Sequence, residues 1–255
     1  LAPLPNQKLP RLGWPETDAI QHFQFSSRAV DTFRSGVVAR RRLAAHTDLY
    51  CQGEVATEFY VLNSGWMCLY RLLPDGRRHN LKFALPGDLI GFSMAGKMPM
   101  DHSAASLTEV TLCVLDRDIA LRRYAQDSEL MGRLGWYVSQ QHAWTLQQLT
   151  SITRATAIER ISHLLLELFI RARREIPQPN ATLKVPLTQQ EIGDAVGLSA
   201  VHVNRMIAEL RDEEILTLSG GMLTILDPER MMELATLDPD AVMDYPQVLP
   251  AVSLS

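Results

Sequence analysis

Composition and charge exclude several classes of protein. Of the 255 residues, 46% are hydrophobic and 21% are charged, which is typical of a globular protein, and the net charge of −4 does not favour a general binder of polyanions. No apolar run approaches the roughly 20 residues that cross a bilayer, and the first residues hold no hydrophobic signal core, so we expect a cytoplasmic protein with no membrane partner.

The sequence carries no motif of an enzyme or of a metal site. It has no nucleophile elbow, no Walker loop and no carboxylate pair placed by a motif, so we expect no enzymatic activity. Cys51, Cys68 and Cys113 lie far apart, without the spacing of metal ligands. Each lies in a strand-like stretch, where we expect a small buried side chain.

The N-terminal part, residues 1–34, predicts an irregular arm because prolines interrupt it, with one short helix near 16–23. Residues 35–116 then alternate short apolar stretches with turn signals such as Asn63-Ser64-Gly65 and Pro86-Gly87-Asp88. Many short strands at near-regular spacing indicate a sandwich or a barrel. The predicted strands are 37–43, 58–63, 66–72, 78–84, 103–107 and 110–115.

Residues 117–154 contain no proline and predict one long helix, which Asp127 or Ser128 could cap. A heptad seam runs along it, with polar His142 and Thr145 among its members. A helix of this length between two domains predicts pairing with a second copy, in which His142 sets the register rather than binding a ligand. The alternative is a helix packed on its own domain. The seam comprises Met131, Leu134, Val138, His142, Thr145, Leu149 and Ile152.

Two capping boxes of the form Thr-x-x-Glu mark helix starts in the C-terminal part, residues 155–236. The first, at 156–159, opens a helix with a strong apolar face. The second, at 188–191, opens a short helix that Gly197 ends cheaply in a left-handed conformation. The other elements predicted here are a strand at 183–185, a helix at 229–236 and a loose tail at 237–255.

A second short helix follows the turn at Gly197 immediately. Ser199 caps it, and an inward stripe of apolar side chains recurs at spacings of three and four. Gly220-Gly221 then joins two short strands into a hairpin. Such a helix pair alone also fits an ordinary hairpin in a core, but with the β-hairpin it forms a winged helix, whose second helix can enter a DNA major groove. The stripe comprises Val203, Met206, Ile207 and Leu210.

This order of parts resembles the Crp/Fnr family of bacterial transcription regulators over residues 35–235. The match is carried by FALPGDLIGF at 83–92 and, more specifically, by LTQQEIGDAVGLSAVHVNRMIAELRDEEIL at 187–216. The resemblance implies an α+β fold: an N-terminal antiparallel, jelly-roll-like β-roll, a dimerisation helix at 117–154 and a C-terminal winged helix-turn-helix. It also implies a homodimer on a palindromic site in double-stranded DNA, an effector in the β-roll, and RNA polymerase as a partner.

The resemblance places an effector pocket at Gly91, Phe92, His102 and Ser103. Members that bind cyclic AMP carry Gly-Glu and Arg-Ser there, where the acid takes the ribose and Arg-Ser takes the phosphate. A phenyl ring and an imidazole cannot replace a carboxylate and a bidentate guanidinium, so we expect weak or no cyclic-AMP binding.

The Gly-Phe pair instead resembles the Fnr and FixK side of the family. Fnr proteins hold an iron–sulfur cluster with N-terminal cysteines, and residues 1–30 contain no cysteine. Haem-binding relatives exist, but the seven histidines of this chain show no pair at a diagnostic spacing. We therefore expect neither cofactor.

The recognition helix departs from the well-studied members, which carry Arg, Glu and a further Arg where this chain has Ala200, Val201 and Arg205. Arg205 keeps the residue type that reads guanine through O6 and N7, and Val201 suits a thymine methyl. Thr188 and Ser199 lie at helix starts, which suit phosphates. The predicted DNA contacts are Thr188, Gln189, Ser199, Ala200, Val201, His202, Asn204 and Arg205.

The sequence therefore predicts a dimeric, sequence-specific DNA-binding transcription regulator. The alternative is a ligand-binding sensor whose winged helix docks a protein rather than DNA. Sparse basic charge favours that alternative, because the acidic and basic residues between 184 and 211 cancel. They are Lys184, Arg205 and Arg211 against Glu191, Asp194 and Glu209.

Overall fold

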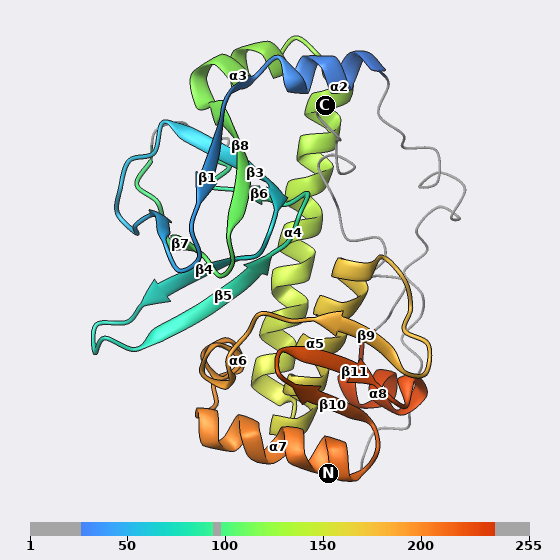
Figure 1. Cartoon of the computed structure of the whole chain (residues 1–255). Helices are drawn as coiled ribbons and strands as arrows, with labels where there is room; N and C mark the ends of the chain where they lie inside the picture. The colour runs from blue at the N-terminus through green and yellow to red at the C-terminus, as the bar shows by residue number, and fades with distance from the viewer. Residues whose placement is uncertain (1–26, 94–97, 238–255) are drawn as a thin grey trace, which may run out of the picture.

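The structure, a computed structural model, describes residues 27–93 and 98–237. A strand-rich domain, a long helix and a smaller domain of helices and one sheet follow one another along the chain (Figure 1). The helix predicted near 16–23 and the tail from residue 238 lie outside the described residues. No helix in the described ranges is long and apolar enough to cross a membrane.

The strand-rich domain is a roll of two four-stranded antiparallel sheets, which confirms the predicted fold class. The first sheet has the order β1-β8-β3-β6 and the second has β2-β7-β4-β5. All six predicted strands are present. The two additional strands, β2 and β6, are only three and two residues long, too short to show a period of two in the sequence. The strands are β1 (Val37–Leu43), β2 (Asp48–Tyr50), β3 (Glu58–Ser64), β4 (Met67–Leu72), β5 (Arg78–Ala84), β6 (Leu89–Ile90), β7 (Ser103–Ser106) and β8 (Val110–Asp116).

An apolar cluster joins the two sheets. Leu62 of β3 and Met67 of β4 are both fully buried in it, together with Ile90 of β6. Side chains along a strand alternate between its two faces, so each strand contributes every second residue to this core. Cys68 and Cys113 are buried as predicted, but Cys51 is exposed because it follows the end of β2 in a turn.

Two predictions about helices were wrong. The helices concerned are α2 (Ser27–Arg34), α3 (Arg117–Tyr124) and α4 (Ser128–Arg154). The predicted arm 1–34 ends in the helix α2, whose Phe33 stacks on Tyr124 at 5.5 Å between ring centroids. The single helix predicted over 117–154 is two helices. The chain breaks between them because the Asp127 carboxylate accepts a hydrogen bond from the Leu130 amide (3.1 Å) and starts a new helix.

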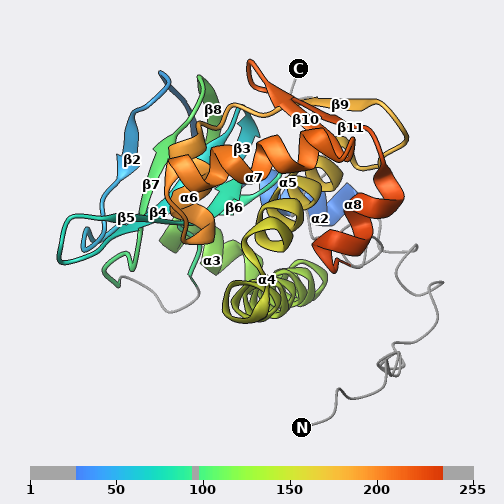
Figure 2. The same ribbon diagram turned by 90° about the horizontal axis from the view of Figure 1, so that it is seen from below.

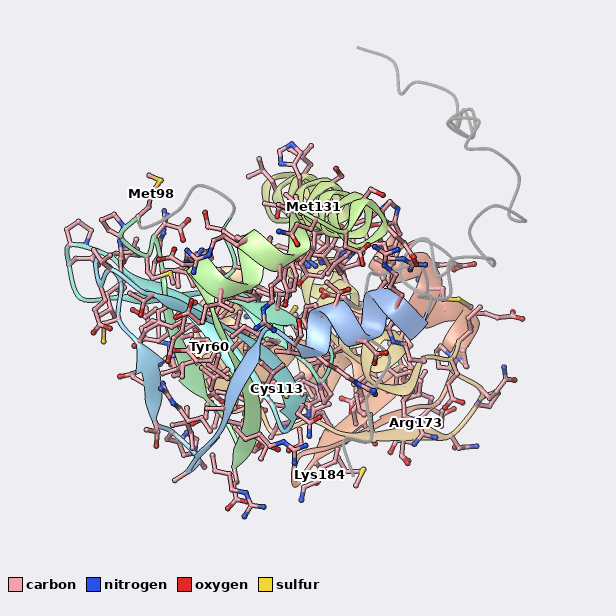
Figure 3. All side chains as sticks on the ribbon, turned by 90° about the horizontal axis from the view of Figure 1, so that it is seen from above. Tyr60, Met98, Cys113, Met131, Arg173 and Lys184 are labelled. Atoms are coloured by element: carbon pink, nitrogen blue, oxygen red, sulfur yellow. The ribbon has the colours of Figure 1, made fainter. Side chains whose placement is uncertain are left out.

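Helix α4 lies at one edge of the molecule. Figures 2 and 3 look along its axis from opposite ends, and in both views one side of α4 faces the rest of the described chain while the other side faces none of it. The first part of the predicted seam lies on the covered side, because Leu134 is buried and Met131 packs beside it against α2 and α3. Val138, His142, Thr145 and Leu149 are exposed.

The C-terminal domain is the predicted winged helix. Helix α5 supplies a long apolar face, and α8 and the recognition helices pack on it. The antiparallel sheet has the order β10-β11-β9. The elements are α5 (Ala157–Arg173), β9 (Ala181–Lys184), α6 (Gln189–Val196), α7 (Ala200–Asp212), β10 (Leu216–Ser219), β11 (Met222–Ile225) and α8 (Pro228–Ala235).

The two domains share one apolar core. Cys68 and Phe83 of the second sheet belong to the same buried cluster as Leu164 of α5 and Val196 of α6. Polar contacts accompany it: the Asn80 side-chain amide donates to the Glu191 carbonyl oxygen at 3.0 Å. Strand β5 therefore lies directly against α6 (Figure 2).

Candidate nucleic-acid interface and sensor site

Helix α6 begins and ends where the sequence places its caps. Thr188 and Glu191 form the predicted capping box, in which Glu191 Oε2 accepts from the Thr188 amide at 2.7 Å. Gly197 ends the helix in the left-handed region, at φ +71°. Gly193 lets the two helices cross closely, because a Cβ there would come within 2.4 Å of the Leu198 carbonyl oxygen.

Helix α7 divides into an apolar face and an exposed face. The Ser199 hydroxyl caps it, accepting from the His202 amide at 3.3 Å. All four residues of the predicted stripe are buried. On the opposite face Val201 is 82% exposed, and Asn204 and Arg205 are exposed beside it. Ala200 and His202 are partly exposed, as expected at the edges of that face.

Few charges surround the exposed face of α7. Within the described residues, Arg205 takes part in no hydrogen bond or ion pair, whereas Arg211 on the same helix is bound to Asp212 at 2.8 Å. Gln189 is exposed at the start of α6, and its neighbour Gln190 is bonded to Asp194. Arg205 is thus the cation of α7 that a ligand can reach without breaking an ion pair.

The wing lies beside α7. Gly220 and Gly221 join β10 to β11 with positive φ angles of +57° and +74°, the conformation that a tight hairpin turn requires. Met222 next to this turn is 43% exposed. The second helix and the hairpin therefore present one composite surface, which Figure 1 shows at the lower end of the molecule.

Two of the predicted effector residues, Gly91 and His102, meet around Tyr50. The Tyr50 hydroxyl is 2.8 Å from His102 Nε2, and His102 Nδ1 is 2.5 Å from an Asp101 carboxylate oxygen. Burial, with the Asp101 charge as a smaller cause, raises the pKa of the Tyr50 phenol, so its hydroxyl stays protonated and donates to Nε2. Gly91, at φ +70°, packs against the Tyr50 ring, which a Cβ would approach to 3.4 Å.

The other two predicted effector residues point elsewhere. The Ser103 hydroxyl is buried and accepts from the Gln52 amide at 2.9 Å. Phe92 packs edge-on against Phe59, 5.2 Å between centroids, in the cluster under α2 and α3. The structure thus gathers Gly91 and His102 at Tyr50, while Phe92 belongs to a separate aromatic core.

Comparisons with known proteins agree with this architecture. The family model of the cyclic nucleotide-binding domain matches residues 40–127, and that of the Crp-like helix-turn-helix domain matches 159–234. The activator AadR of Rhodopseudomonas palustris is 30% identical over 200 residues, which cover 76% of this chain and 82% of AadR. The chain belongs to the Crp/Fnr family of transcription regulators.

Other members of the family are similar at the same level. The nitrogen fixation regulator FixK of Rhizobium meliloti is 31% identical over 190 residues, 73% of this chain and 82% of FixK. The cAMP-activated global regulator of Mycobacterium tuberculosis is 32% identical over 190 residues, 73% of this chain and 83% of that protein. The solved structure of FixK2 from Bradyrhizobium japonicum has a TM-score of 0.68 at 25% identity, covering 78% of this chain and 97% of that one.

One polar cluster of this Crp/Fnr protein was not predicted from the sequence. Asp88, in the turn before β6, lies 2.8 Å from Arg171 of α5, which also binds Glu167 at 2.7 Å, and all three side chains are buried. A signal was present: Glu167 and Arg171 are a Glu–Arg pair four residues apart inside an otherwise apolar helix face. Such a pair is expected to meet a further charge when it is buried.

Proposed function

We propose that this Crp/Fnr protein acts as a homodimer on a palindromic DNA site, with α7 of each subunit in a major groove. The exposed face of α7 carries the proposal. Val201 is 82% exposed and Arg205 is not engaged by any described side chain, so both are available to base edges. A valine meets a thymine methyl there, and an arginine reads guanine.

The remaining predicted contacts suit the phosphate backbone. Thr188, Gln189 and Ser199 lie at the starts of α6 and α7, where amide groups and the helix dipole favour an anion. Ala200 is small enough for close approach to the groove, and His202 and Asn204 flank it. Because so few charges take part, we expect a shallow dependence of affinity on salt concentration.

The exposed side of α4 supports pairing of two subunits. Val138 is 44% exposed and Leu149 is 58% exposed, and they lie on one side of the helix with His142 and Thr145 between them. Apolar side chains on an exposed heptad seam are stabilised when a second helix covers them. The dimer that follows would present two α7 helices to neighbouring turns of the major groove.

A cyclic nucleotide does not fit the sensor residues. Phe92 stands where the ribose needs an acceptor, and its ring is held against Phe59. His102 is held between Tyr50 and the Asp101 carboxylate, and that negative charge opposes a phosphate beside it. Regulation, if it acts through the β-roll, therefore requires a ligand of another chemistry.

Selection of purified, ligand-free protein against a randomised DNA pool tests the proposal. An enriched palindrome with half-sites about 10 base pairs apart supports a dimeric regulator that needs no small effector. An enriched sequence without two-fold symmetry contradicts the dimer. If no sequence is enriched while the protein is folded and dimeric, either the DNA-binding state requires a ligand or the winged helix docks a protein partner instead of DNA.

The mismatch between the predicted effector residues and a cyclic nucleotide leads to a separate prediction, that the protein does not bind cyclic AMP. Calorimetric titration of the full chain should give no saturable heat in the micromolar range, because the acid and the arginine that take the ribose and phosphate are replaced by Phe92 and His102. The M. tuberculosis relative, described as cAMP-activated, serves as the positive control. A micromolar fit to one site per subunit contradicts this prediction.

A further inference from the structure

The end of α7 that is proposed to read DNA has no buried side chain of its own. The side chains of its first turn, residues 200–202, are all exposed or partly exposed, and the first buried side chain of the helix is Val203. The direction of this turn therefore depends on the connection from α6, residues 197–199. Within that connection, Leu198 packs against the core of the domain and is only partly buried.

Helix α6, which leads into this connection, is poorly stabilised at its own C-terminus. It is eight residues long, and the last four carbonyl groups of a helix have no partner within it. The negative end of the helix dipole favours a cation there, but α6 has no basic residue in its last turn and carries Asp194 instead. The C-terminus of α6 therefore depends on donors from other elements.

Arg160 of α5 supplies one of these donors. Its Nη1 donates to the Val196 carbonyl oxygen at 2.8 Å, and a Cβ added to Gly197 would lie 3.7 Å from the same nitrogen. The Val196 carbonyl belongs to the peptide bond between Val196 and Gly197, which is the first peptide of the connection to α7. Arg160 thus places a positive charge at the negative end of α6 and holds the peptide at which the chain turns.

The position of Arg160 does not stabilise its own helix. Helix α5 begins at Ala157 after the cap Thr156, so Arg160 lies in its first turn. A cation is unfavourable at this positive end of the helix dipole. Within the described ranges Arg160 also forms no ion pair with a carboxylate. The hydrogen bond to α6 is therefore the interaction that accounts for a cation at this position.

A second donor to α6 comes from the β-roll. Nδ1 of His79 in β5 lies 2.9 Å from the Asp194 carbonyl oxygen, and because a carbonyl oxygen only accepts, Nδ1 carries the hydrogen. The next residue, Asn80, donates to the Glu191 carbonyl oxygen at 3.0 Å. Helix α6 is thus held by β5 along its length, which Figure 2 shows beside it, and by Arg160 at the last carbonyl before the turn.

We propose that Arg160 is a positioning residue for DNA recognition, which fixes the connection 197–199 and thereby the direction of the first turn of α7. This inference rests on the proposed function. Without Arg160 the connection adopts several arrangements, and ordering it on binding lowers the affinity for the specific sequence. Nonspecific DNA is bound mainly through phosphate charge, so its affinity depends much less on the direction of this turn.

Hydrogen exchange of the full chain without DNA tests the positioning independently of DNA recognition. Arg160→Met keeps the aliphatic stem and removes the charged donor. The amides of Gly197 and Leu198, which both donate to the Gly193 carbonyl oxygen, should then exchange about tenfold faster. The amide of Leu165 in the middle of α5 should exchange at the wild-type rate.

Three further variants control this measurement. Arg160→Lys restores a charged donor and should bring both exchange rates back to within about threefold of the wild type. Arg160→Gln keeps a neutral donor and should give intermediate rates, which serve if Arg160→Met does not fold. Arg173→Met, on the same helix and exposed, should match the wild type.

DNA affinity measures the consequence for recognition. For the palindrome that the wild type selects, the Kd of Arg160→Met should rise about tenfold, while the Kd for random DNA should change by less than about twofold. Wild-type exchange at the connection, exchange that is faster throughout the domain, or an equal rise of both Kd values would each overturn the proposal. If the winged helix docks a protein instead of DNA, the proposed function fails, and the exchange rates still decide whether Arg160 orders the first turn of α7.

Discussion

At the scale of single residues, the proposed sequence recognition depends most on Arg205. Arg205→Ala should cost about 1–3 kcal/mol of binding free energy and relax specificity at one base pair, since it removes the proposed guanine contact. Selection experiments on both proteins measure this. Arg211→Ala is the control on the same helix, because Arg211 is already paired with Asp212. A loss that is equal for all sequences would instead make Arg205 a phosphate contact.

Gly193 is a second single residue with a testable role, in stability rather than in recognition. Gly193→Ala should destabilise the protein by about 1–3 kcal/mol, because the new Cβ would meet the Leu198 backbone and force α6 and α7 apart. Gly132→Ala on α4 is the matched control. A Cβ at Gly132 would meet no atom of the described residues within 4 Å, so helix propensity should raise stability by about 0.5–1 kcal/mol.

Denaturant unfolding of the three proteins, at one concentration and one pH, compares these changes directly. Opposite signs for the same chemical substitution would show that the close crossing of α6 and α7 sets the cost. A stabilising Gly193→Ala would mean that the turn at Leu198 yields easily, and that the tight helix-turn-helix crossing is not under packing constraint.

At the scale of elements, substitutions on α4 test the proposed dimer. Val138→Lys puts a charge on the exposed seam, where the partner helix would bury it beside its own copy, so the dimer should dissociate. Ser139→Lys, the next residue along, adds the same charge away from the seam and should leave the dimer intact. Light scattering on size-exclusion fractions measures both masses. A dimeric Val138→Lys protein would place the subunit interface elsewhere.

Local signals predicted the elements better than they predicted side-chain directions. Thr156, Thr188 and Ser199 cap helices as expected, because a cap needs only residues three positions apart. Leu134 falls on the heptad positions of the predicted seam, yet α2 and α3 bury it. The hydrophobic pattern of α4 alone does not show that other helices cover this part of it. The break at Asp127 was visible only as a cap, because nothing in the sequence forbids a continuous helix there.

The same difference between elements and side-chain directions holds for the candidate site. The two faces of α7 follow from periodicity, and so does the exposure of Val201 and Arg205. Phe92 was assigned to the effector pocket from its position beside Gly91, but its ring packs on Phe59. The direction of a side chain at such a position depends on which strands and helices cover each face of the sheet. Tyr50, which contacts both Gly91 and His102, was missed because it belongs to a strand too short to predict.

At the scale of the whole molecule, a buried charge cluster joins the β-roll to the winged-helix domain. Arg171 of α5 binds Asp88 at 2.8 Å, with the two side chains 2% and 3% exposed, and Lys82 of β5 lies 3.5 Å from the same carboxylate oxygen. Asp88 also accepts from the Leu85 amide at 3.0 Å, which fixes the turn before β6. One carboxylate thereby joins a β-roll turn to the helix on which α6 and α7 pack.

Removing one charged side chain from such a cluster lowers the free energy of unfolding by more than the intact cluster adds to it, because the other charges stay buried without a partner. Arg171→Met should therefore lower the unfolding free energy by about 3–5 kcal/mol. Arg173→Met, two residues along and exposed, should change it by less than about 0.5 kcal/mol.

Hydrogen exchange adds a domain-level measurement: in Arg171→Met, amides of β5 and α6 should exchange faster together, because both lie at the interface that Arg171 holds. Faster exchange confined to α5 would reduce the cluster to a local role and leave the shared apolar core of Phe83, Leu164 and Val196 as what couples the domains.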